Sequence, residues 1–187
     1  VSMIPVGNTF RFYSVTSGVP RRDAASYRLD VTGLVSSPRS HTLADLQAMP
    51  QTELVRDFQC VTGWRVPEVR WSGVRLGDLI DTAGPTGDAT AVQFTSFDGT
   101  DTESLTLEQA RRADVMVALR MLDAPVTHDH GGPVRLYVAP MYGYKSLKWL
   151  SGIELTREVV PGYWENRGYS VDGWVGGSNG RNDAPTV

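Results

Sequence analysis

Residues 130–155 read HGGPVRLYVAPMYGYKSLKWLSGIEL, and this stretch holds two strand-like runs on either side of a basic turn. Residues 133–139 and 151–158 predict the two strands, because β-branched and apolar residues dominate both runs. Strand-like runs also occur before this stretch in the sequence. Further strands are predicted at residues 27–31, 54–61 and 115–119 and on both sides of the Asp98–Gly99 turn.

The helices predicted between these strands are short. Capping residues at Thr42 and Thr106 start two of them, and a third runs through residues 76–80 and ends at Gly84. A doubly wound parallel sheet needs a crossover of about a dozen residues or more at each step, which these helices do not supply. The sequence therefore predicts a mixed, β-rich α+β fold.

The composition is that of one globular domain, with 187 residues, 41% hydrophobic and 21% charged. We predict a single domain over residues 1–175 and a flexible tail over residues 176–187, where small polar residues dominate. The net charge of −3 leaves no basic field for nucleic acid. No apolar run approaches the ~20 residues that span a bilayer, and the start at Val1 leaves room for an export signal or membrane anchor upstream.

Cys60 is the single cysteine of the chain and lies in the run RDFQCVTGWRV, residues 56–66. One thiol excludes an intrachain disulfide framework and a cysteine-rich metal site. From the residue alone three interpretations stay open: a buried small hydrophobe, a nucleophile near Arg56 and Arg65, or a ligand to a soft metal whose other ligands come from a cofactor.

The basic turn at residues 142–149 places Lys145, Ser146 and Lys148 after a glycine. Two ammonium groups and a hydroxyl suit a phosphate group. The G-x-x-x-x-G-K spacing of a P-loop is missing, so a solvated basic turn is the alternative.

His128 and His130 flank Asp129 just before one of the predicted strands. A zinc site would need at least one further ligand, and the sequence identifies none. The alternative is that His130 donates a hydrogen bond to a ligand, with the charge of Arg135 behind it.

Taken in order along the chain, these segments resemble the molybdopterin-binding domain of the sulfite oxidase family, including the bacterial methionine sulfoxide reductase catalytic subunits. The match runs from about residue 10 to residue 174. The segments that carry it are FYSVTSGVP (12–20), DFQCVTGWRVPEVRWSGVRLGDLI (57–80), FTSFDG (94–99), the stretch 130–155 and GYWENRGY (162–169).

The resemblance implies one molybdenum–molybdopterin cofactor per chain, with Cys60 as the protein ligand to the metal because it matches the family's C-V-x-x-W segment. The cofactor would supply the other sulfur ligands. Arg65 stands where sulfite oxidases carry an arginine that meets the anionic substrate. Cofactor contacts are further implied for Tyr13, Ser14, Ser96, His130, Arg135, Ser146, Leu147 and Lys148.

The implied reaction is oxygen-atom transfer to or from a small sulfoxide- or sulfite-type substrate. No C-x-x-C-H haem motif occurs, so electrons are expected to pass through a separate haem or quinone-linked partner. We expect a monomer in an extracytoplasmic location, periplasmic or cell-surface, with a membrane tether and a cytoplasmic location as further options. The alternatives are a catalytically silent molybdopterin-fold domain, an electron-transfer subunit, and a metal-free thiol peroxidase acting through Cys60.

Overall fold

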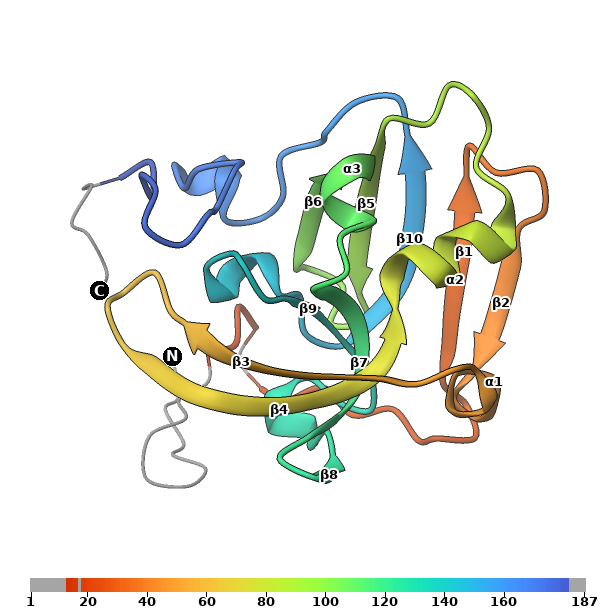
Figure 1. The fold of residues 1–187 in the computed structure, drawn as a ribbon, viewed down its shortest axis with the longest axis horizontal. Coiled ribbons are helices and arrows are strands. Elements are labelled where there is room, and N and C mark those ends of the chain that lie inside the picture. Colours follow the sequence, from red (N-terminus) through yellow and green to blue (C-terminus); the bar gives the residue numbers. More distant parts are fainter. Residues whose placement is uncertain (1–12, 17, 182–187) are drawn as a thin grey trace.

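The computed structural model describes residues 13–16 and 18–181, which form two five-stranded sheets with short helices beside them (Figure 1). The first sheet has the order β2-β1-β10-β5-β6, with β1 (Arg28–Gly33), β2 (Arg39–Thr42), β5 (Ala91–Ser96), β6 (Thr102–Thr106) and β10 (Leu150–Thr156). The second has the order β3-β4-β7-β8 with β9 paired to β7, and comprises β3 (Thr52–Gln59), β4 (Arg65–Arg75), β7 (Val115–Met121), β8 (Ala124–Pro125) and β9 (Arg135–Val138).

Among the described strands, β1 and β10 pair in parallel and every other pairing is antiparallel. The helices are α1 (Leu43–Ala48), α2 (Leu76–Ala83) and α3 (Leu107–Ala110), with the 3₁₀ turns η1 (His128–His130), η2 (Gly143–Lys145) and η3 (Glu165–Arg167). The predicted β-rich mixed α+β class is confirmed. None of the described helices is long and apolar enough to cross a membrane.

Both predicted capping boxes are present. The Thr42 hydroxyl accepts from the Asp45 amide at 3.0 Å while the Asp45 carboxylate accepts from the Thr42 amide at 2.8 Å, and Thr106 and Gln109 repeat the arrangement. Each box satisfies amides that a helix start leaves without partners. Helix α2 has Gly84 as its C-cap in the left-handed conformation, as expected of a C-cap glycine.

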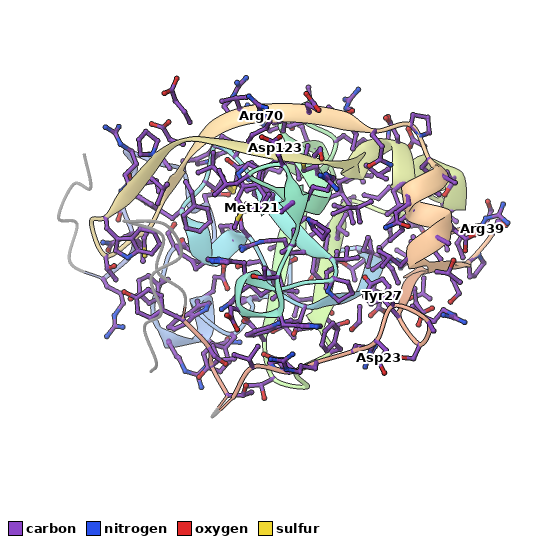
Figure 2. The ribbon with its side chains drawn as sticks, turned by 90° about the horizontal axis from the view of Figure 1, so that it is seen from below. Asp23, Tyr27, Arg39, Arg70, Met121 and Asp123 are labelled. Atoms are coloured by element: carbon purple, nitrogen blue, oxygen red, sulfur yellow. The ribbon has the colours of Figure 1, made fainter. Side chains whose placement is uncertain are left out.

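The main core lies between the two sheets and takes in α2. Leu29 of β1, Ile80 of α2, Val117 of β7 and Leu136 of β9 are all fully buried in it. A second, smaller core covers the β4–β7–β9 surface, where the Trp71 and Tyr137 rings stack with centroids 4.4 Å apart. Arg70 and Asp123, labelled in Figure 2, form an exposed ion pair of 3.2 Å that joins β4 to the β7–β8 turn.

The longest strand, β4, is absent from the sequence-based prediction, which assigned no strand between Cys60 and the helix at residue 76. Bulges interrupt the pairing of β4 with both neighbours, Glu68 has a φ of 51°, and Pro67 lies within the strand. These irregularities break the two-residue alternation by which a strand is recognised. The preceding strand, β3, ends at Gln59, so Cys60 lies just beyond it rather than inside it.

Part of the expected tail is packed against the domain. Asn179 is 4% exposed, its carbonyl accepts from the Ser170 amide at 2.9 Å, and the Tyr142 hydroxyl donates to the Gly177 carbonyl at 3.2 Å. The packed part of the chain therefore continues to at least residue 179, because these backbone groups find partners in the domain. Residues 182–187 lie outside the described residues, as do 1–12 of the predicted domain.

Gly73 generates a stability prediction, because a β-carbon there would lie 2.1 Å from the Val117 carbonyl oxygen on β7. Gly73→Ala should lower the free energy of unfolding by about 1–3 kcal/mol, the usual effect of overpacking. Gly87→Ala is the matched control, since no atom lies within 4 Å of a β-carbon there. Urea denaturation of both variants measures the difference, and equal midpoints would contradict the close approach.

Candidate functional site

A pocket of about 190 Å³ opens where the segment after β3, the η2 turn and the segment 162–169 meet. Its aromatic lining consists of Tyr13, Phe58, Trp64, Tyr144, Trp164 and Tyr169. Its polar lining consists of Cys60, Thr62, Asp101, His130, Arg135, Ser146 and Lys148. The structure thus brings together six of the residues proposed from the sequence: Tyr13, Cys60, His130, Arg135, Ser146 and Lys148.

Cys60 is held in a tight turn at the end of β3. Its amide donates to the Trp64 carbonyl at 2.9 Å, and its own carbonyl accepts from the Gly63 amide at 3.1 Å. The residue is 8% exposed, and the thiol lies 3.2 Å from the Thr62 hydroxyl. A hydroxyl at that distance can donate to the thiolate and stabilise it.

The aromatic wall beside Cys60 is built by stacking. The Phe58 and Trp64 rings stack with centroids 5.8 Å apart, and Tyr13 approaches Trp64 at 6.4 Å. Gly143 is required beneath Phe58, because a β-carbon at that position would lie 2.4 Å from the ring. The η2 turn and the Cys60 segment can therefore approach closely.

Three basic side chains line the polar side of the pocket. Burial, followed by the charges of Arg135 and Lys148, lowers the pKa of His130 to about 4, so the imidazole is neutral at pH 7. Burial lowers the pKa of Lys148 to about 7, with Arg135 as the second cause. An anionic group placed here would raise that pKa and restore the full ammonium charge.

Arg135 connects the two turns that border the pocket. Its guanidinium donates to the His130 carbonyl and to the Ser146 carbonyl, both at 2.7 Å, and the side chain is 3% exposed. Burial lowers its pKa to about 10, which still leaves it charged at pH 7. Arg135 therefore brings a positive charge into the pocket wall and at the same time fixes η1 against η2.

Other residues proposed from the sequence lie outside the pocket lining. Arg65 forms an ion pair of 3.6 Å with Asp57, and both side chains are about half exposed. The Ser96 hydroxyl accepts from the Asp98 amide at 3.0 Å, and the Ser14 hydroxyl donates to the Gly18 carbonyl at 2.9 Å. These two hydroxyls hold local turns.

Leu147 and Lys145 differ from their neighbours in the basic turn. The Leu147 side chain is part of the main core. Lys145 was expected beside a phosphate or in solvent, but both expectations are wrong: it is fully buried and ion-paired with Glu103 and Glu165. An ammonium group held between two carboxylates is not available to a phosphate.

Sequence reasoning missed Asp101, Tyr144, Trp164 and Tyr169 as pocket residues. The segment GYWENRGY contributed to the family resemblance without any residue of it being proposed for the site, and Asp101 follows a turn signal that explains an aspartate without any site. Asp101 is 7% exposed, and its Oδ1 has no hydrogen-bond partner among the described residues. A buried carboxyl facing a pocket of this kind has no local sequence signature.

Comparison with known proteins identifies the family of the chain. The oxidoreductase molybdopterin-binding domain matches residues 16–164. The chain belongs to that family. It is 36% identical over 159 residues to the uncharacterized oxidoreductase YuiH of Bacillus subtilis, covering 84% of this chain and 80% of that protein. It is 34% identical to the putative protein-methionine-sulfoxide reductase subunit YedZ1 of Azospira oryzae, covering 95% of this chain and 66% of that protein.

The molybdopterin-binding domain family match agrees with the fold. The sulfane dehydrogenase SoxCD of Paracoccus pantotrophus superposes with a TM-score of 0.70 at 22% identity, over 77% of this chain and 41% of that chain. Proteins named sulfite oxidase and protein-methionine-sulfoxide reductase catalytic subunit also match at 28% identity, and the chain spans 46% and 57% of their lengths. The chain is thus a molybdopterin-dependent oxidoreductase domain of the sulfite oxidase family.

The residues of the pocket fit the molybdenum cofactor of this family. The one thiol of the chain suits a soft metal, and the cations of Arg135 and Lys148 suit the anionic part of the pterin. Among the described residues no three His, Cys, Asp or Glu side chains gather as a metal-binding group. A metal at Cys60 would therefore take its other ligands from the cofactor.

Asp101 generates a prediction about pH. Burial, with the charges of Asp98 and Glu165 added and that of Lys148 opposing, raises the pKa of Asp101 to about 7. The carboxyl of the unfolded chain loses its proton near its ordinary pKa of 3.8, whereas the folded protein holds the proton up to about pH 7. The free energy of unfolding therefore falls as pH rises between these two values, and the destabilisation is complete above pH 7. Asp101→Asn should therefore stabilise cofactor-free protein at pH 8, by up to about 4 kcal/mol, and change little at pH 4. Thermal melts across this range measure the difference, and a gain that does not depend on pH would contradict the assignment.

Proposed function

We propose that this domain catalyses oxygen-atom transfer to or from a small substrate at one molybdenum–molybdopterin cofactor per chain, with Cys60 as the protein ligand to the metal. The observation that carries the proposal is the placement of the only thiol in a pocket that Arg135 and Lys148 also line. A thiolate and a pair of cations in one pocket match the two chemically different ends of such a cofactor.

When bound, the cofactor supplies the two-electron redox chemistry of oxygen-atom transfer. The chain supplies the binding, orientation and electrostatics. Thr62 can donate a hydrogen bond to the Cys60 thiolate at 3.2 Å, which tunes the metal ligand. Asp101, with a pKa of about 7, can hold or release a proton at the pocket wall near neutral pH.

For the substrate, we favour a neutral sulfoxide over the sulfite anion. Arg65, the residue expected to meet an anionic substrate, is paired with Asp57 and lies outside the pocket lining. Trp64, Trp164 and Tyr169 do line the pocket, and aromatic surfaces suit the apolar groups that flank a sulfoxide. The position of Arg65 outside the pocket lining supports a sulfoxide over sulfite, because a sulfite dianion needs several charged donors near the reacting centre.

Electrons are proposed to pass through a separate redox protein. A relative that shares 34% identity with the chain is named as a subunit, which supports a protein partner. The expected extracytoplasmic location and monomeric state stay predictions.

The ligand role of Cys60 is tested by metal analysis. Protein made with cofactor biosynthesis intact should contain molybdenum close to one per chain, and Cys60→Ser should lose most of it, because a serine hydroxyl is a poor ligand for a soft metal. Thr16→Ala, a change at a partly exposed residue outside the pocket lining, is the control. Full retention of molybdenum by Cys60→Ser would refute the assignment.

The substrate is tested by a dye-linked assay in both directions on cofactor-loaded protein. Reduction of small sulfoxides should exceed oxidation of sulfite by at least about tenfold in kcat/KM. Arg65→Ala should change sulfoxide reduction little, since its side chain points to Asp57. Faster sulfite oxidation that depends on Arg65 would overturn the substrate choice, and activity with neither compound would favour a catalytically silent domain.

A further inference from the structure

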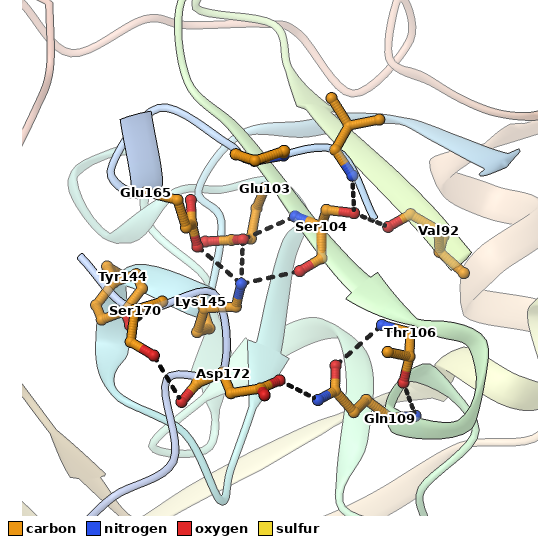
Figure 3. Close-up of polar contacts among 12 residues, drawn as sticks. Val92, Glu103, Ser104, Thr106, Gln109, Tyr144, Lys145, Glu165, Ser170 and Asp172 are labelled. Atoms are coloured by element: carbon orange, nitrogen blue, oxygen red, sulfur yellow. Dashed lines mark hydrogen bonds and ion pairs between the residues drawn. The ribbon is translucent and has the colours of Figure 1, made fainter. Parts of the chain in front are cut away.

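Three buried charged side chains, Lys145, Glu103 and Glu165, form a cluster (Figure 3). The Lys145 ammonium contacts the carboxylates of Glu103 and Glu165, the latter at 2.8 Å, and donates to the Ser104 carbonyl at 2.9 Å. The side chains of Lys145 and Glu103 are fully inaccessible and that of Glu165 is 1% exposed. None of the three lines the pocket itself.

Each member of the cluster belongs to a segment that contributes to the pocket. Glu103 stands two residues after Asp101, and Lys145 stands between Tyr144 and Ser146. Glu165 directly follows Trp164, and Tyr169 comes four residues later. One ammonium group therefore joins β6, the η2 turn and the segment after β10.

That last segment, residues 160–174, is here called the strap. It has little regular structure of its own, with one 3₁₀ turn at η3. Its further ties to the domain include three hydrogen bonds: the Tyr163 amide donates to the Thr102 carbonyl at 3.0 Å, the Tyr142 amide donates to the Gly173 carbonyl at 2.7 Å, and the Tyr144 hydroxyl donates to the Ser170 carbonyl at 2.6 Å. A segment with few backbone partners depends on its side-chain anchors for order.

The cluster sets one buried ammonium group against two buried carboxyl groups. Burial, together with the nearby charge of Glu165, raises the pKa of Glu103 well above its usual range. One protonated carboxyl, one carboxylate and one ammonium have no net charge. Removal of Glu165 deletes its 2.8 Å ion pair with Lys145, so the strap loses its buried link to η2 and β6.

We propose that the cluster of Lys145, Glu103 and Glu165 is a positioning device for the active site: it anchors the strap so that Trp164 and Tyr169 form one wall of the cofactor pocket. The three residues are positioning residues, because none of them reaches the pocket. The effect on catalysis rests on the proposed function, whereas the anchoring of the strap does not.

Amide hydrogen exchange of cofactor-free protein tests the anchoring. Glu165→Ala should speed exchange of the strap amides at Tyr163 and Ser170 by at least about tenfold and leave the amides of β1 and β10 unchanged. Glu165→Gln keeps an acceptor for the ammonium and should show a smaller increase, so it provides the comparison if the alanine variant does not fold. Asp172→Ala is the matched control, since it removes an exposed tether of the same strap, the 2.9 Å bond from Gln109, and should change exchange less than about twofold.

Two functional readouts complete the test. Alkylation of Cys60 in cofactor-free Glu165→Ala should be several-fold faster than in the parent, because the strap residues share the pocket with the thiol. In cofactor-loaded protein, kcat/KM per bound molybdenum should fall about tenfold for Glu165→Ala and stay unchanged for Asp172→Ala.

Three results would overturn the proposal. They are strap exchange that does not change in either Glu165 variant, exchange that rises equally in β1 and β10, and a loosened strap with parental Cys60 alkylation and parental activity per molybdenum. If the parent protein binds no molybdenum, the proposed function fails, while exchange and alkylation still decide whether the cluster anchors the pocket wall.

Discussion

The structure around the pocket depends on how two buried cations are compensated. Lys145 lies between two carboxylates, and Arg135 donates its hydrogen bonds to the backbone carbonyls of His130 and Ser146. Both arrangements satisfy the donors, which a buried cation requires. They differ in charge: carboxylates neutralise an ammonium group, whereas carbonyls leave the guanidinium charge in place. The pocket therefore receives a positive charge from Arg135 and none from Lys145, although the sequence places Lys145 in the basic turn.

The same two cations hold together segments that are far apart in the sequence. Arg135 fixes η1 to η2, and Lys145 fixes η2 to β6 and to the strap. The Cys60 turn completes the pocket by packing Phe58 over Gly143. In this arrangement the sheets provide a rigid frame, and the chemistry lies on the turns that the frame positions.

The pocket has two chemically distinct sets of lining residues. His130, Arg135 and Lys148 are basic side chains whose pKa values burial lowers, so an anion would bind there with a gain in charge on Lys148. The aromatic set comprises Tyr13, Phe58, Trp64, Tyr144, Trp164 and Tyr169. A cofactor with an anionic pterin end and a metal at a thiolate fits such a lining. The aromatic set suits the weakly polar substrate that we propose.

The sequence by itself determined the β-rich α+β class, both capping boxes, most strands and the family. These features rest on local patterns or on the order of segments, which a sequence displays directly. Only the tertiary structure decided that Lys145 is neutralised, that Arg65 pairs with Asp57 and that Asp101 faces the pocket. The reason is physical: the partners of Lys145 lie 42 and 20 residues away, and burial sets the pKa of Asp101. The irregular strand β4 was missed because its bulges remove the alternation that a strand normally shows.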